Sequence, residues 1–129
     1  MDSQTGKWID IALEDYEIAK LTYSNNRYVY CLFMCQQALE KMIKAVYQNT
    51  YKKVPPRKHD LISLFIASGL SDKLDSHLNE LLAVLTQCYI DSRYPEYKDR
   101  ISGFATQENC RNYLEKTGEV LKWLKEMLK

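Results

Sequence analysis

The chain of 129 residues is long enough for one hydrophobic core, and we expect a single domain over residues 1–129. Hydrophobic residues make up 46% of it and charged residues 27%, which is typical of a soluble globular protein. The net charge of +1 excludes a general attraction to nucleic acid or to anionic membranes, so any basic site has to be local.

No apolar run approaches the roughly 18 residues that a membrane-spanning helix needs. The first residues lack the apolar stretch of a signal peptide, so we expect a cytoplasmic protein without membrane contact. The cysteines and histidines do not have the spacing of zinc ligands, and the sequence predicts no metal and no cofactor. We expect reduced thiols packed in the core, at Cys31, Cys35, Cys88 and Cys110.

Two long helices are predicted first, over residues 4–24 and 27–48. Apolar residues recur in both at intervals of three and four, which is the spacing of one helix face. In the second helix these residues are Leu32, Cys35, Leu39, Met42 and Val46. Asn25 and Asn26 favour a tight turn between the helices, because asparagine tolerates left-handed backbone conformations. Such a short connection makes the two helices antiparallel neighbours.

A basic loop with two prolines follows over residues 49–58, and a short third helix comes after it. Asp60 is the predicted N-cap of this helix and Gly69 ends it. Ser71 or Asp72 is expected to cap a longer fourth helix.

The fourth helix is expected to end near Arg93, because a residue before proline is pushed out of the α region. A loop that contains Gly103 follows it, and Thr106 is the predicted N-cap of the last long helix. The sequence therefore predicts an all-α fold, an up-and-down bundle of four long helices plus one short helix.

A group of polar residues interrupts the apolar pattern of the second helix. Gln36 follows Leu32 by four residues, so its amide points toward the apolar side and needs hydrogen-bond partners there. We expect it to belong to a buried polar network or to contact a partner chain. Two alternatives exist for the flanking polar residues. They form a solvated helix face, or they belong to that network; these residues are Gln37, Glu40, Lys41 and Lys44.

Two further segments carry candidate chemistry. His59 titrates near neutrality in its unperturbed state, so it could serve as an acid–base group, or it could merely order the turn before the Asp60 cap. Arg93 lies at the end of the fourth helix, where it either complements the helix dipole or binds a phosphate. In the second case Lys98 and Arg100 lie nearby in sequence, and Tyr94 or Tyr97 could stack on a base.

Taken together, these segments resemble the HEPN domain family of small helical proteins. The resemblance is carried by residues 36–45 (Gln-Gln-Ala-x-Glu-Lys-x-x-Lys-Ala), by 58–61 (Lys-His-Asp-Leu) and by 92–95 (Ser-Arg-Tyr-Pro), in that order, and it spans residues 8–124. It implies a helical bundle that forms homodimers. It also implies a partner, because many members act with a minimal nucleotidyltransferase, often as a toxin–antitoxin pair.

One branch of the family comprises metal-independent endoribonucleases, whose signature is an arginine followed four to six residues later by a histidine. Arg93 matches the arginine, but no histidine follows it. The resemblance therefore implies a non-catalytic member that binds a nucleotide or an RNA phosphate near Arg93. The expected phosphate-binding residues are Arg93, Tyr94, His59, Lys44 and Lys41, and the expected structural polar network is Gln36, Gln37, Glu40 and Asp60.

Two alternatives remain open at this point. The first is a metal-independent endoribonuclease with a non-standard site, in which His59 replaces the missing histidine and acts with Arg93. The second is a plain dimeric interaction bundle, because tyrosine and arginine are favoured at interface hot spots. Its tyrosines would be Tyr28, Tyr30, Tyr47, Tyr51, Tyr94 and Tyr97.

Overall fold

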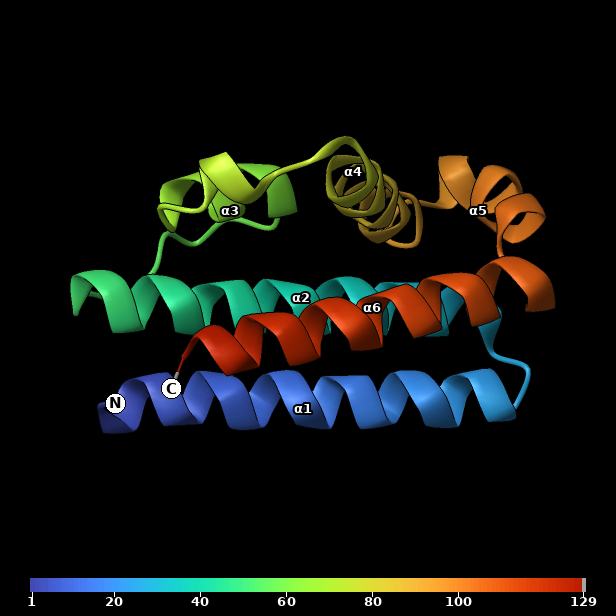
Figure 1. Ribbon diagram of the computed structural model, residues 1–129. Coiled ribbons are helices and arrows are strands. Elements are labelled where there is room, and N and C mark those ends of the chain that lie inside the picture. Colours follow the sequence, from blue (N-terminus) through green and yellow to red (C-terminus); the bar gives the residue numbers. More distant parts are fainter. Residues whose placement is uncertain (129) are drawn as a thin grey trace.

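The computed structural model describes residues 1–128, and within them the chain forms six α-helices, two short 3₁₀ turns and no strand. Helices α1 (Ser3–Ser24) and α2 (Tyr28–Tyr51) lie antiparallel, as the sequence predicts (Figure 1). The turn between them places Asn26 at a φ of 60°, in the left-handed region that asparagine tolerates. Asp2 caps α1 by accepting a hydrogen bond of 2.7 Å from the backbone of Thr5.

Helix α6 (Gln107–Met127) lies beside α1 and α2 and runs in the same direction as α2 (Figure 1). The Thr106 hydroxyl accepts from the backbone N–H of Asn109, which confirms Thr106 as the N-cap of the last helix. The three long helices α1, α2 and α6 thus form one layer of the molecule.

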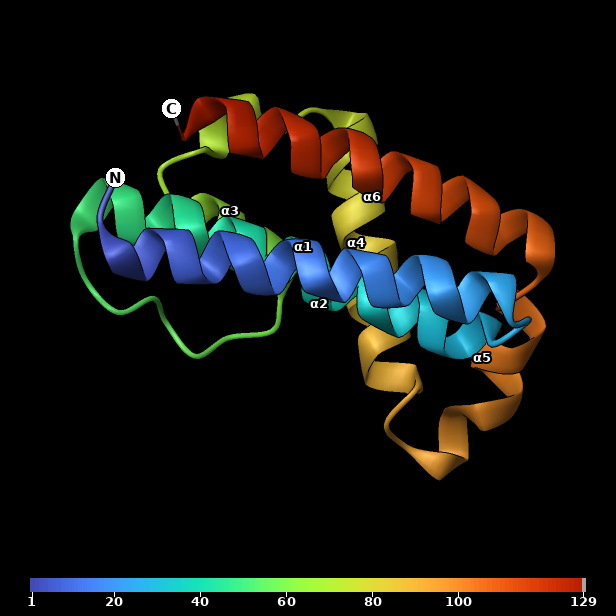
Figure 2. The same ribbon diagram turned by 90° about the horizontal axis from the view of Figure 1, so that it is seen from below.

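The second layer contains α3 (Leu61–Ala67), α4 (Ser76–Asp91) and α5 (Lys98–Phe104). Helix α4 runs across the direction of α1, α2 and α6 and is seen nearly end-on in Figure 1 and from the side in Figure 2. The all-helical prediction is confirmed. The helical bundle agrees with the prediction, but the count of one short helix is not confirmed, because both α3 and α5 are short. Within the bundle α4 packs across α1, α2 and α6.

Two boundaries also differ from the sequence prediction. The expected caps of the fourth helix, Ser71 and Asp72, lie in a 3₁₀ turn, and α4 begins later, where the Asp75 carboxylate accepts from the backbone of Leu78 at 2.8 Å. The expected loop before Thr106 contains α5, a short helix that buries little more than Ile101. Asp60 caps α3 as predicted.

Helix α2 is surrounded by α1, α3, α4 and α6, and thirteen of its residues are buried. The core around it consists mainly of leucine, alanine and cysteine side chains. All four cysteines are free and buried, which confirms the expectation of reduced thiols in the core. Among residues 1–128, no helix combines the length and the apolar character that crossing a membrane requires.

Candidate functional site

The polar residues of α2 converge on the Glu40 carboxylate, whose side chain is only 2% exposed. One carboxylate oxygen, Oε1, accepts from Gln36 Nε2 at 3.1 Å and lies 2.9 Å from His59 Nδ1. The other, Oε2, accepts from Lys44 Nζ at 3.1 Å. Gln36 Nε2 also donates to the backbone oxygen of His59 at 2.8 Å, so α2 holds the His59 segment by its main chain as well as by its ring.

Burial alone would raise the pKa of the Glu40 carboxyl. The hydrogen bonds from His59 and Gln36 and the positive charge of Lys44 outweigh that effect, so the pKa of Glu40 lies below its ordinary value. Glu40 is therefore a buried anion near neutral pH, and it is stabilised by surrounding donors and cations.

The two lysines expected to bind phosphate are tied to this network. The Lys44 ammonium lies 5.6 Å from the centre of the Trp8 ring and is buried beside Glu40. The Lys41 ammonium donates to Gln37 Oε1 at 2.9 Å and lies 3.7 Å from an oxygen of Asp15 on α1. Of the two alternatives, the solvated face does not apply to Glu40 and Lys44, which are buried in the network because α2 is enclosed on several sides, while Lys41 is half-buried.

His59 joins this network to the molecular surface, because its side chain is 52% exposed. In neutral His59, donation from Nδ1 to the Glu40 carboxylate leaves Nε2 as an acceptor. In protonated His59, both nitrogens donate, and the ring forms an ion pair with Glu40. Glu40 thus orients His59 in either state, in the way that a carboxylate orients a histidine in acid–base and metal sites.

Tyr89, near the end of α4, contacts both His59 and Arg93. The His59 ring centre lies 4.9 Å from that of Tyr89, and Phe33 stacks on Tyr89 at 5.5 Å. The Arg93 guanidinium donates to the Tyr89 hydroxyl at 2.6 Å, and its central carbon lies 4.9 Å from the centre of the Tyr89 ring. The sequence analysis did not single out Tyr89, although its position one turn before Arg93 is a signal that could have identified it.

The remaining residues of the 92–100 segment are arranged differently. Arg100 forms two hydrogen bonds to the buried carboxylate of Asp91, at 2.8 and 2.5 Å, and it lies over the Tyr97 ring. These hydrogen bonds from Arg100 hold the pKa of Asp91 below its ordinary value. Tyr94 is exposed and meets Tyr97 edge to face. Arg93 therefore keeps its charge available, whereas that of Arg100 is matched by a carboxylate.

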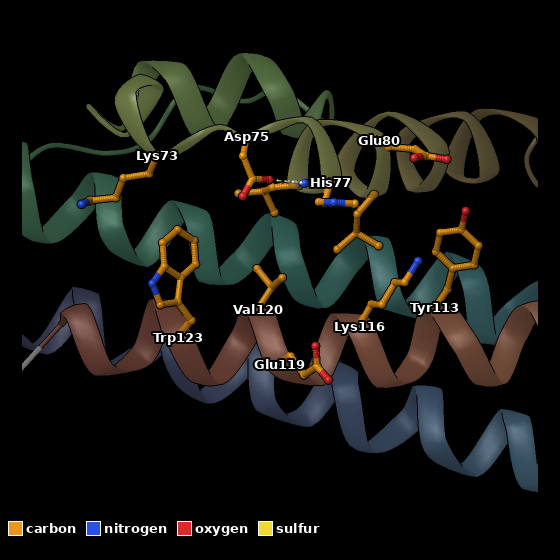
Figure 3. Close-up of a pocket in the computed structure, with 11 residues that line it drawn as sticks. Lys73, Asp75, His77, Glu80, Tyr113, Lys116, Glu119, Val120 and Trp123 are labelled. Atoms are coloured by element: carbon orange, nitrogen blue, oxygen red, sulfur yellow. Dashed lines mark hydrogen bonds between the residues drawn. The ribbon is translucent and has the colours of Figure 1, made fainter.

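A separate pocket of about 430 Å³ lies between the first half of α4 and α6 (Figure 3). Trp123 and Val120 of α6 line one end of it, and Tyr113 lies at the other end, where the Lys116 ammonium is 5.4 Å from the Tyr113 ring centre. Its charged lining residues are of both signs: Lys73, Lys116, Asp75, Glu80 and Glu119. None of His59, Tyr89 and Arg93 lines this pocket, and its mixed charge does not favour an anion.

No metal centre is indicated by the geometry, since residues 1–128 hold no group of three or more His, Cys, Asp or Glu side chains with the placement of metal ligands. The cluster of Glu40, His59, Tyr89 and Arg93 instead combines an oriented imidazole with an exposed guanidinium. Such a pair can bind an anionic oxygen ligand, and the imidazole can also accept or donate a proton.

Comparisons with known proteins agree with this fold. The family model of the HEPN domain matches residues 5–127. Among solved structures, the chain is similar to TT1696 from Thermus thermophilus, with a TM-score of 0.82 and 21% sequence identity, over 97% of this chain and 98% of the other. At this identity the likeness concerns the fold. No curated protein sequence matches the chain.

Proposed function

Because the chain belongs to the HEPN domain family, we propose that it is a non-catalytic helical protein that acts with a minimal nucleotidyltransferase, in a module of toxin–antitoxin type. We further propose that it binds a nucleotide or an RNA phosphate near Arg93. The observation that carries the binding proposal is the placement of Arg93 and His59 against the same tyrosine ring.

The chemistry of these two groups supports a phosphate ligand. Arg93 is exposed, and its planar guanidinium can donate two parallel hydrogen bonds to phosphate oxygens. His59 presents Nε2 at the surface while Glu40 holds Nδ1. Tyr94 follows Arg93 directly in the chain, is exposed, and offers a ring on which a base can stack.

Isothermal titration calorimetry with AMP and ATP tests the binding proposal. We expect wild-type protein to bind at least one of them, and we expect Arg93→Ala to weaken binding by about tenfold or more, because one charge-assisted contact is lost. Arg111→Ala is the matched control, since Arg111 is an exposed arginine of α6. Equal affinities of the Arg93 and Arg111 variants would remove the support for this site.

The partner proposals need separate measurements. Co-expression with a nucleotidyltransferase encoded next to this chain should yield a complex that survives size-exclusion chromatography. Light scattering on the protein alone should give the mass of a homodimer. A monomer at every workable concentration would contradict the dimer. It would equally count against the interaction-bundle alternative, which relies on exposed aromatic residues such as Tyr30 and Tyr94.

One observation favours a second candidate function, a metal-independent endoribonuclease. The hydrogen bond from His59 to the buried Glu40 leaves Nε2 free to take a proton from a ribose hydroxyl, and Arg93 could stabilise the charge that develops on the phosphate. Single-stranded RNA incubated in EDTA should then be cleaved, and cleavage should be lost in His59→Ala and in Arg93→Ala. If the RNA remains intact, the endoribonuclease proposal fails and the non-catalytic proposal is retained.

A further inference from the structure

We propose that Tyr89 is the positioning residue of the anion site, and that it holds Arg93 and His59 so that both reach one phosphate group. This inference rests on the proposed binding of a nucleotide near Arg93. Tyr89 is suited to this task because the residue is only 7% exposed and is fixed in α4, where Phe33 stacks on its ring.

Arg93 depends on Tyr89 for its orientation. The residue lies beyond the end of α4, which closes at Asp91, and its side chain is exposed. Within residues 1–128, the Tyr89 hydroxyl is the one hydrogen-bond partner of the Arg93 guanidinium, at 2.6 Å, and no carboxylate pairs with it. Without this contact a long arginine side chain would lose order, because fixing its rotamers costs entropy that no other partner would offset.

The kind of partner is as important as its position. Arg100, in the same segment, is held by a carboxylate, which cancels its charge toward a ligand. Tyr89 holds Arg93 with a neutral group, and burial raises the pKa of the Tyr89 hydroxyl further above its ordinary value. The guanidinium is thus oriented and keeps its full positive charge for an incoming phosphate.

His59 is fixed by two contacts, one of which is with Tyr89. Its ring packs 4.9 Å from the Tyr89 ring centre, and Nδ1 is held by Glu40. The same tyrosine ring therefore contacts both the guanidinium and the imidazole. This pair fits a terminal phosphate better than a neutral ligand, since the guanidinium donates hydrogen bonds to anionic oxygens and Nε2 of the imidazole does so when His59 is protonated.

The test compares AMP with adenosine by calorimetry in wild-type protein and in Tyr89→Phe, which keeps the ring and removes the hydroxyl. We expect AMP affinity to fall about fivefold in Tyr89→Phe while adenosine affinity stays unchanged, because the lost contact orients a phosphate ligand. Tyr113→Phe is the control, since it removes a phenol hydroxyl elsewhere, on α6.

A double-mutant cycle with Arg93→Ala separates positioning from a merely structural role. If Tyr89 acts through Arg93, Tyr89→Phe has no effect on AMP affinity once Arg93 is alanine, whereas a structural effect would add to that of Arg93→Ala. Unchanged AMP affinity in Tyr89→Phe, or additive losses, would overturn the inference and leave nucleotide binding intact. If wild-type protein binds AMP no better than adenosine, the proposed phosphate site itself fails.

Discussion

Several stabilising contacts depend on the carboxylate of Glu40. Replacing it with glutamine keeps the size of the side chain but leaves the buried Lys44 ammonium without its counter-charge. We expect Glu40→Gln to lower the free energy of unfolding by about 3–5 kcal/mol, the usual cost of breaking a buried ion pair. Urea denaturation measures this value. Glu119→Gln, an exposed position of α6, should change stability by no more than about 0.5 kcal/mol.

The pH dependence of stability should show the same carboxylate. Because the pKa of Glu40 is lowered in the folded protein, the unfolded chain binds its proton first as pH falls. The stability that the ionised Glu40 carboxylate contributes is fully present above its ordinary pKa of about 4.5 and is lost as the pH falls below that value. Urea midpoints between about pH 6 and pH 3 should therefore fall less steeply in Glu40→Gln than in wild type. Equal slopes would contradict the buried anion.

Asp15 acts in the opposite direction over the same range. Burial raises the pKa of Asp15 in spite of the nearby Lys41, so protonation of Asp15 at low pH favours the folded state. The comparison of slopes between Glu40→Gln and wild type is for this reason more informative than the slope of either protein alone.

At the level of helices, replacing two glycines with alanine should change the stability of the protein in opposite directions. A methyl group at Gly118 of α6 would overlap the hydroxyl of Tyr16 on α1, which donates to the backbone oxygen of Leu114 at 3.0 Å. Gly103 of α5 faces open space. We expect Gly103→Ala to stabilise the protein by about 0.5–1 kcal/mol through helix propensity. Gly118→Ala should destabilise it by about 1–2 kcal/mol, because Tyr16 has to move.

Thermal unfolding followed by circular dichroism distinguishes the two glycine variants by the sign of the change in Tm. A rise in Tm for Gly118→Ala would mean that Tyr16 repacks at little cost. A fall for Gly103→Ala would mean that the backbone of α5 needs glycine at that position.

The helices with strong apolar spacing and a clear cap were predictable from the sequence. Asp60 and Thr106 cap helices as expected, and the inward phase of Gln36 correctly indicated a buried amide. The start of α4 was not predictable, because Leu74 lies in phase with Leu78 although its backbone is extended and the helix begins only at Ser76. Helix α5 was missed because Ile101 alone gives too little apolar pattern.

The site was predictable only in part, for a physical reason. Gln36 and Glu40 could be singled out as polar residues of an amphipathic helix, and His59 and Arg93 by their chemistry next to a helix cap and at a helix end. Their convergence depends on α4 crossing the bundle, which carries Tyr89 to His59. Helical spacing does not encode the crossing direction of two helices, and so the contact with Tyr89 could not be derived from it.

For the molecule as a whole, one hydrophobic core predicts one cooperative unfolding transition. The two tryptophans report on different places, since Trp8 lies on α1 and Trp123 stacks on Phe65 of α3. Trp8→Phe and Trp123→Phe each leave one tryptophan. For each variant we expect the midpoint of urea unfolding followed by tryptophan fluorescence to coincide with the midpoint followed by circular dichroism. Two distinct midpoints within one variant would mean that residues 1–129 unfold in more than one step.

The hydrogen bond from Gln36 to the backbone oxygen of His59 has a consequence for the integrity of the chain. The loop before His59 is rich in lysine and arginine, and its exposed peptide bonds are open to trypsin. Since α2 holds His59 by both its main chain and its ring, the site does not depend on covalent continuity through that loop. A molecule nicked after Lys53 should therefore keep its two fragments together and retain the affinity for AMP of the uncut protein.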